Sequence, residues 1–335
     1  MLVCSSSLRA ALIFCSSPGA SALKGYHTDK RRTYTAVDIN ASALVWSTKR
    51  DRKASWSAAH ERARQSCERV ASVNTRYLSN RDKKSYQDFG GWCLPVGTNA
   101  TRLIKLANEQ SYMLPVVHVL ADAPIVRFID RLLRGCDDPL SDAPCASAPE
   151  HSVIDFGAGV GQFGHALKAI DPRHRYRGYD GAGNVEEATN GFVRWEDLAN
   201  ANLSVHKADW VMSFEVGEHI PHAMEQHFVC NLHTHNCRGI VLSWAYLRQW
   251  GRGHVNNHGL AYILTLFTEL GYVYDAHATK ELRSRHESPK RALFTPRDES
   301  DGLHTSSWFA KSIYIFRRSK VQGGSGCKRT QSVVV

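Results

Sequence analysis

The segment from Phe214 to Pro221 contains side chains able to act on a reacting group. Glu215, Glu218 and His219 lie at positions i, i+3 and i+4. In a helical turn these three side chains would share one face. Two carboxylates and an imidazole that converge can bind a hard divalent cation. Alternatively, His219 can act as a general base on a hydroxyl group. The segment is compatible with cation binding and with general-base catalysis, and both interpretations remain open.

A glycine-rich loop follows the strand predicted just before it. Asp155 precedes Gly157, Gly159 and Gly161. Glycine permits positive φ and lets the backbone approach a ligand closely. A dinucleotide-binding loop would place its third glycine at position 162, which is Gln162 here, and this spacing disfavours a nicotinamide cofactor. Asp155 is placed to order the loop and to meet the charged amino-acid end of a cofactor.

A second acid, Asp180, ends the next predicted strand and is followed by Gly181. An acid at this position of a doubly wound sheet binds ribose hydroxyls. The alternative is an aspartate that caps a helix in a turn. Its spacing from Asp155 favours the cofactor role.

These motifs together resemble the class I S-adenosylmethionine-dependent methyltransferase superfamily. The segments 242–245 and 251–257 resemble a eukaryotic methyltransferase-like group. The resemblance covers His151 to Arg318, about half of the chain. It implies that Asp197, after the third strand, contacts the adenine. The cofactor site that it implies consists of Asp155, Gly157, Gly159, Gly161, Asp180, Gly181, Asp197 and Glu215. It also implies a seven-stranded sheet of order 3-2-1-4-5-7-6, with S-adenosyl-L-methionine at its carboxyl edge.

The Glu-x-x-Glu-His segment is similar to that of ubiquinone-biosynthesis O-methyltransferases and small-RNA 2′-O-methyltransferases. In those families the segment is associated with a divalent metal. The similarity implies a further ligand before the next long helix, for which His254 is the candidate. The predicted set for Mg²⁺ or another divalent cation is Glu215, Glu218, His219 and His254. Many class I enzymes carry the segment without a metal, and its Glu and His then organise the loop. The predicted catalytic residues are His219 and Glu218.

The elements that must position these residues alternate along the chain. Strands are predicted over 152–156, 176–179, 192–195, 210–214, 239–244, 272–274 and 312–316, and helices over 163–170, 224–233 and 260–270. This alternation predicts an α/β fold with a doubly wound, Rossmann-like sheet of seven strands. The last strand is expected to be antiparallel to the others.

Composition divides the chain into four parts. Residues 1–85 form a basic, poorly ordered leader or linker with a weak helix near 58–73, and residues 86–150 a helical lead-in to the core. Residues 151–320 form the predicted cofactor-binding core, and 321–335 a flexible tail. Within the lead-in, Pro124 is placed to open a helix whose apolar residues continue to Leu133.

Charge is concentrated at the N-terminus. Residues 1–100 contain 16 Lys and Arg and 7 Asp and Glu, so they carry +9 of the net +10. A basic leader can contact nucleic acid or an anionic membrane. The nearly neutral remainder argues against a large phosphate footprint. O-methylation of a small-molecule acceptor is therefore favoured; the alternatives are RNA or protein methylation and a non-catalytic scaffold that binds a partner.

The leader and the cysteines bear on the compartment. Residues 1–24 are rich in Ser and poor in acids, which suits a transit-type leader as well as an untargeted tail. No apolar run reaches the roughly 18–20 residues that cross a bilayer, so the core is expected to be soluble, and cytoplasmic by default. Nine irregularly spaced cysteines predict mostly reduced thiols. The sequence leaves the compartment, the oligomeric state and the acceptor open.

Two further patterns are weak. Cys230, His233, His235 and Cys237 lack the paired spacing of a structural zinc site. Three sequons for N-glycosylation, at Asn40, Asn99 and Asn202, are expected to be chance matches.

Overall fold

The computed structural model describes most of the chain after residue 100 and one helix before it. The described residues are 49–72, 93–94, 101–106, 108–115, 118–141, 143, 145, 148–200, 203, 205–251, 253–286, 303–304 and 306–319. Three predictions fall outside these residues: the disorder of the rest of the leader, the flexible tail and the three sequon asparagines.

A seven-stranded sheet forms the centre of the molecule, with the order β6-β5-β4-β7-β8-β11-β9. Its strands are β4 (Ser152–Phe156), β5 (Arg175–Asp180), β6 (Val193–Trp195), β7 (Ala208–Ser213), β8 (Asn236–Ser243), β9 (Tyr272–Tyr274) and β11 (Ile313–Arg318). Only β11 runs antiparallel to its neighbours in this sheet. Numbered along the chain, the order is 3-2-1-4-5-7-6, so the predicted fold class is confirmed.

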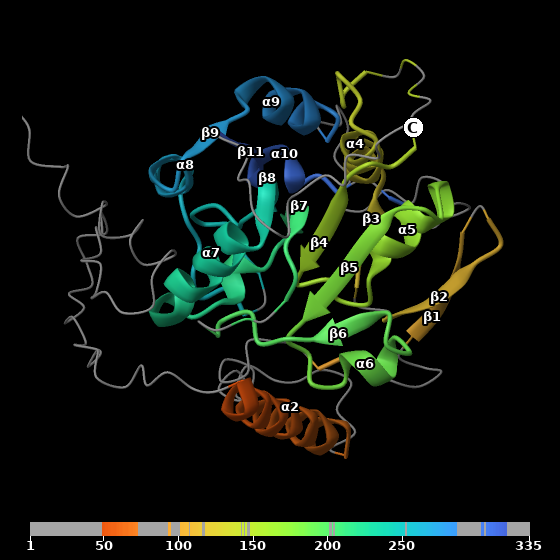
Figure 1. Cartoon of the computed structure of the whole chain (residues 1–335), viewed down its shortest axis with the longest axis vertical. Coiled ribbons are helices and arrows are strands. Elements are labelled where there is room, and N and C mark those ends of the chain that lie inside the picture. The colour runs from red at the N-terminus through yellow and green to blue at the C-terminus, as the bar shows by residue number, and fades with distance from the viewer. Residues whose placement is uncertain are drawn as a thin grey trace, which may run out of the picture.

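Helices cover both faces of the sheet (Figure 1). On one face lie α4 (Ala123–Leu133), α5 (Gln162–Ile170), α9 (Ala276–Ser284) and the short α10 (Phe309–Ser312), and on the other lie α7 (Glu225–Thr234) and α8 (Leu260–Glu269). Successive strand residues point to opposite faces, so Val153 packs in the first layer and Ile154 in the second. Both faces are buried, which explains why the strands are apolar at consecutive positions.

Helix α4 begins at a buried aspartate that joins three distant segments. Asp122 caps the helix by accepting from the backbone N–H of Ile125 at 3.2 Å. The same carboxylate accepts from His286 Nε2, 2.8 Å away, and from the backbone N–H of Ser306, also at 2.8 Å. Asp122 and the His286 side chain are fully buried. The network ties the start of α4 to the end of α9.

Replacing Asp122 with alanine tests this network. The change leaves the buried His286 and two backbone N–H groups without their acceptor, so the free energy of unfolding should fall by about 3–5 kcal/mol. Asp275, which caps α9 at a more exposed position, is the matched control, and Asp275→Ala should cost about 1 kcal/mol. Urea denaturation measures both, and equal losses would contradict the assigned role of Asp122.

Several elements outside the central sheet differ from the sequence-based expectation. The leader contains a helix, α2 (Lys49–Ser72), which begins nine residues before the weak helix predicted at 58–73. The lead-in contains a hairpin of β1 (Thr101–Lys105) and β2 (Ser111–Pro115), and β3 (Ala121–Asp122) pairs with β10 (Leu303–His304). These strands are two to five residues long, too short to give a clear alternating pattern.

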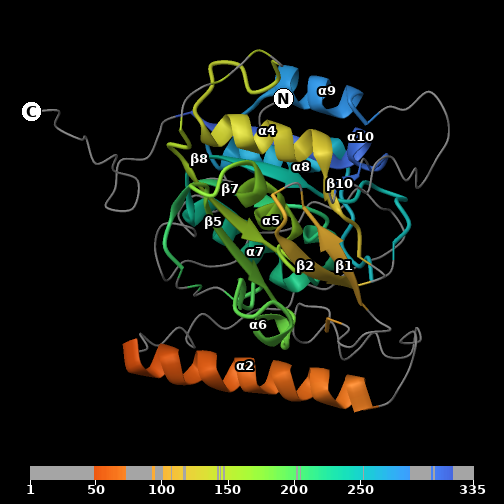
Figure 2. The same cartoon turned by 90° about the vertical axis from the view of Figure 1, so that its right-hand side faces the viewer.

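Helix α2 lies across the edge of the sheet at which the parallel strands end, below β6 and α6 (Val185–Ala188) (Figures 1 and 2). The Trp56 indole N–H donates to the Glu196 carboxylate at 3.2 Å. The His60 ring stacks on the Trp195 ring, with centroids 4.6 Å apart. The helix thus packs against the end of β6 and the residue that follows it.

The expectation of mostly reduced thiols is wrong for the described cysteines. Disulfides join Cys67 to Cys93 and Cys136 to Cys145, and Cys230 and Cys237 are also disulfide-bonded. Cys230 and Cys237 therefore have no thiolate to offer a zinc ion. The Cys67–Cys93 bond connects α2 to the segment that leads into the core.

Within the described residues, no helix combines the length and the apolar character needed to span a membrane.

Candidate active site

The glycine-rich loop connects β4 to α5 at the carboxyl edge of the sheet. Gly157, Gly159 and Gly161 have φ values of 83°, 56° and 78°, a left-handed conformation that other residues rarely adopt. A Cβ atom on Gly157 would lie 2.2 Å from Cγ2 of Val216. Glycine at this position therefore provides both the backbone conformation and the space for close packing.

Asp180 holds the glycine-rich loop through its carboxylate. One oxygen accepts from the backbone N–H of Gly159 and the other from that of Ala182, each at 2.8 Å. Burial raises the pKa of Asp180 to about 6. Asp180 does not cap a helix, because α6 begins five residues later, after Asn184. The helix-cap alternative is therefore wrong, whereas the ribose-binding role remains a prediction.

Asp155 lies beneath the loop, with 2 % of its surface exposed. Its carboxylate accepts a hydrogen bond from the Tyr176 hydroxyl at 2.9 Å. Burial raises the pKa of Asp155 to about 7. This position supports the first expected role of Asp155, which is to order the loop. The second, contact with the cofactor, remains a prediction.

Asp197 and Gly181 flank the region where α2 meets the sheet. The Asp197 carboxylate accepts from the backbone N–H of Ala199 at 3.0 Å, and burial raises its pKa. The carbonyl of Gly181 accepts from the indole N–H of Trp195 at 3.1 Å. The adenine contact predicted for Asp197 remains a prediction.

The Glu-x-x-Glu-His segment does not form the expected single helical face. Glu215 has a left-handed φ of 55°, and the following 3₁₀ helix contains only Gly217–His219. The Glu215 carboxylate accepts from Gln249 Nε2 at 2.9 Å and from the Ser312 hydroxyl at 3.1 Å. Glu215 is therefore held by the last residue of α10 and by the loop after β8.

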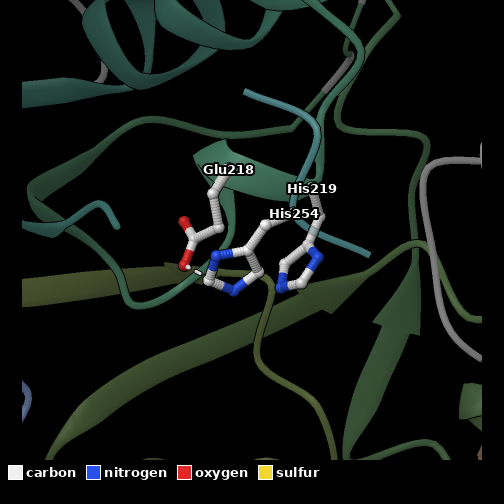
Figure 3. Close-up of side chains that lie close together, drawn as sticks. All are labelled: Glu218, His219 and His254. Carbon is white, nitrogen blue, oxygen red and sulfur yellow. Dashed lines mark ion pairs between the residues drawn. The ribbon is translucent and has the colours of Figure 1, made fainter. Parts of the chain in front are cut away.

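Three of the four predicted metal ligands do converge. One ligand atom from each of Glu218, His219 and His254 lies within 4.8 Å of the other two (Figure 3). Glu218 is fully buried, and neither carboxylate oxygen has a hydrogen-bond partner among the described residues. His254 Nε2 lies 4.0 Å from Glu218 Oε1. A buried carboxylate in this position needs a proton or a cation beside it.

Burial favours the neutral forms of Glu218 and His219. Burial raises the pKa of Glu218 well above its usual range, and the nearby carboxylate of Glu215 raises it further. Burial, together with the His254 ring beside it, lowers the pKa of His219 to about 4. His219 is therefore neutral near pH 7 and can accept a proton or bind a cation through its lone pair.

Backbone hydrogen bonds set the orientation of both imidazoles. His219 Nδ1 donates to the carbonyl of Gly253 at 3.2 Å, and His254 Nδ1 donates to that of Gln249 at 3.3 Å. Each ring therefore carries its lone pair on Nε2. Histidines that bind metals commonly donate their other nitrogen to a carbonyl in this way.

The loop that carries His254 is fixed on the 3₁₀ helix. The backbone carbonyl of Glu218 accepts from the N–H groups of Val255 and Asn256 at 2.8 and 3.0 Å. The indole N–H of Trp244 donates to the carbonyl of Asn256 at 2.7 Å. Trp244 is fully buried, so it packs in the core.

Sequence analysis missed the supporting residues of this site. Tyr176, Gln249 and Ser312 hold the acidic side chains but come from distant segments. His118, before β3, lies 3.6 Å from the position of a Cβ on Gly159. No local pattern marks these residues, because their roles depend on contacts between elements far apart in the chain.

The strand order, with the glycine-rich loop after the first strand and an acid at the end of the second, is the arrangement that the resemblance implied. The chain has the class I methyltransferase fold. No protein-family model and no curated protein matches it.

The chain is similar to several solved structures, but the sequence identity to them is low. Magnesium protoporphyrin IX methyltransferase from Synechocystis PCC 6803, with bound SAH, is 17 % identical, with a TM-score of 0.36, over 58 % of this chain and 82 % of that one. An O-methyltransferase family protein from Burkholderia thailandensis is 14 % identical, with a TM-score of 0.35, over 58 % of each chain. TehB from Haemophilus influenzae is 12 % identical, with a TM-score of 0.35, over 51 % and 58 %.

The raised pKa of Asp155 predicts a pH-dependent stability. Because its folded pKa, about 7, exceeds the unfolded value of roughly 4, the native state binds this proton more tightly. The stabilisation is full below pH 4 and is lost as the pH rises towards 7. The melting temperature of Asp155→Asn, compared with that of the wild type, should therefore rise between pH 5 and pH 8.

Asp171 provides the control for this measurement. A hydrogen bond from Arg173 holds the pKa of Asp171 well below its usual range, so its contribution is constant above about pH 5. The difference between Asp171→Asn and the wild type should stay constant over the same interval. A constant difference for Asp155→Asn as well would contradict the raised pKa.

Proposed function

We propose that the chain binds S-adenosyl-L-methionine at the loop after β4 and transfers its methyl group to a hydroxyl oxygen of a small molecule. The contact between Val216 and Gly157 carries the proposal. It places the glycine-rich loop directly against the segment that bears Glu218 and His219. A donor loop and a cluster able to activate an acceptor thus share one edge of the sheet.

The glycine-rich loop suits the proposed cofactor. Its three left-handed glycines leave the backbone without side chains where a ligand would approach. Asp180 fixes the position of Gly159, and Asp155 supports the loop from below. S-adenosyl-L-methionine supplies a methyl group already activated by its sulfonium, so the protein mainly needs to align the acceptor and take up its proton.

The reaction side of the site can hold a divalent cation. The buried, unpartnered oxygens of Glu218 and the Nε2 atoms of His219 and His254 are the donors that fit. Glu215 completes the proposed set only if its carboxylate leaves Gln249 and Ser312. Two imidazoles with one carboxylate suit Mn²⁺ or Zn²⁺ better than Mg²⁺, which prefers oxygen ligands. Such a cation polarises a hydroxyl group as a Lewis acid.

The proton balance of the reaction assigns a role to His219. When the acceptor oxygen forms its bond to the methyl carbon, the carbon–sulfur bond breaks and the hydroxyl proton must leave. The neutral His219, oriented by its bond to Gly253, is placed to accept this proton. The imidazolium that forms favours the ionised form of Glu218 beside it.

The disulfides bear on the cellular compartment in which the protein folds. Cytosolic thiols are normally kept reduced, whereas disulfides persist in oxidising compartments. Six described cysteines are oxidised, which favours folding in an oxidising compartment over the cytoplasm that was expected by default.

Variants of two acids separate binding from turnover. Asp180→Ala removes the acceptor that holds Gly159, so the affinity for S-adenosyl-L-methionine should fall by at least about 10-fold, the loss expected for one charge-assisted hydrogen bond. Glu218→Gln should bind the cofactor with unchanged affinity and lose turnover. The exposed Glu187→Gln is the matched control and should retain both properties.

Calorimetry on the full chain measures the cofactor affinity. The absence of saturable binding by the wild type would contradict the proposed function and favour the non-catalytic scaffold. Wild-type affinity in Asp180→Ala would contradict the assigned site.

Metal dependence tests the chemistry of the acceptor side. If a cation is required, EDTA should abolish methyl transfer and Mn²⁺ or Zn²⁺ should restore it, while cofactor binding stays unchanged. His254→Ala should then need a higher cation concentration for the same rate. If EDTA has no effect and His219→Ala lowers the rate by about 100-fold or more, His219 acts as a base without a metal.

A further inference from the structure

A second cluster of metal-binding side chains lies next to the candidate active site. One ligand atom from each of His222, Glu225 and His258 lies within 4.8 Å of the other two. His222 is in a 3₁₀ helix (His222–Met224), Glu225 begins α7, and His258 lies two residues before α8. We propose that this cluster is a binding site for a transition-metal ion of the Zn²⁺ type, separate from the site around Glu218.

The carboxylate of Glu225 is the centre of the cluster. Its Oε2 atom lies 2.6 Å from His258 Nε2 and 3.4 Å from His222 Nδ1. Although burial opposes ionisation, hydrogen bonds from His222, His258 and Tyr262 hold the pKa of Glu225 well below its usual range. An anionic oxygen thus faces two imidazole nitrogens, which is the donor set of His₂Glu zinc sites.

The distances are compatible with a bound ion. Donor atoms about 2.0–2.1 Å from a tetrahedral Zn²⁺ lie roughly 3.3 Å from one another. The separation between Glu225 and His222 is already 3.4 Å. The hydrogen bond between Glu225 and His258 would open by less than about 1 Å as the ion replaces its proton.

Surrounding residues orient the ligands. The Asn256 amide donates to Glu225 Oε2 at 2.7 Å, and the Tyr262 hydroxyl donates to the other oxygen. The His258 ring stacks on Tyr262, with centroids 3.8 Å apart. Such outer contacts fix ligand geometry in metal sites. The side chain of His222 is 53 % exposed, so an ion could enter from solvent and keep a water ligand.

Both clusters are built from the same two chain segments. The first uses Glu218, His219 and His254. The second uses His222 and Glu225, four and seven positions after Glu218, and His258, four positions after His254. An ion between Glu225 and His258 would hold the loop of His254 against the 3₁₀ helix. The second site would therefore stabilise the geometry of the first without taking part in the reaction.

Co²⁺ binding to the full chain, without an affinity tag, tests the proposal. The Glu218→Gln background removes the central carboxylate of the first cluster. In this background Co²⁺ should bind with one equivalent at the second cluster and give the visible absorption of a tetrahedral site, and Zn²⁺ should displace it. Adding His222→Ala or His258→Ala should weaken binding by at least about 100-fold, since even outer contacts contribute 10–100-fold.

The exposed His277 on α9 provides the matched control, and His277→Ala should leave Co²⁺ binding unchanged. His222→Ala decides the test if His258→Ala fails to fold, because its exposed side chain contributes little to stability. No Co²⁺ binding in the Glu218→Gln background, or equal binding in all three histidine variants, would overturn the proposal. Cofactor calorimetry on His222→Ala reports independently on the proposed function.

Discussion

The close packing of the segment 215–219 is the constraint on which the rest of the site depends. Val216 occupies the space beside Gly157, and a Cβ on Gly217 would lie 2.4 Å from the ring of Trp244. The segment therefore lies between the glycine-rich loop and the fully buried Trp244. Because protein interiors are close-packed, the cofactor loop, the acidic segment and the loop fixed by Trp244 must keep one mutual arrangement.

The fold could be predicted from the sequence because its signals are local. The apolar runs of β4 and β7, the left-handed glycines after β4 and the alternation of elements each arise from a few neighbouring residues. The convergence of three of the four predicted ligands could be predicted for the same reason, since Glu218 and His219 are adjacent and His254 precedes α8. The helical face assigned to Glu215 was wrong, because periodicity does not reveal a residue with positive φ such as this one.

The remaining features depend on contacts between distant segments. Helix α2 has a strongly polar sequence, and its position depends on Trp56, His60 and the disulfide at Cys67. Cysteine spacing alone does not specify which thiols meet in the fold. Likewise, His222 and His258 lie 36 residues apart, and only the packing of α7 against the loop before α8 brings them to the same carboxylate.

Two buried glutamates of the same segment, Glu218 and Glu225, have pKa values shifted in opposite directions, and their hydrogen-bond donors explain the difference. Glu225 has Asn256, His258 and Tyr262 around it and is held as an anion. Among the described residues the Glu218 oxygens have no such donor, so burial raises its pKa, and a cation or an imidazolium beside it would favour the ionised form. The fold thus places a stable anion where it supports the loop. It places a carboxyl group whose charge depends on its neighbours next to the glycine-rich loop, where charge would develop during methyl transfer.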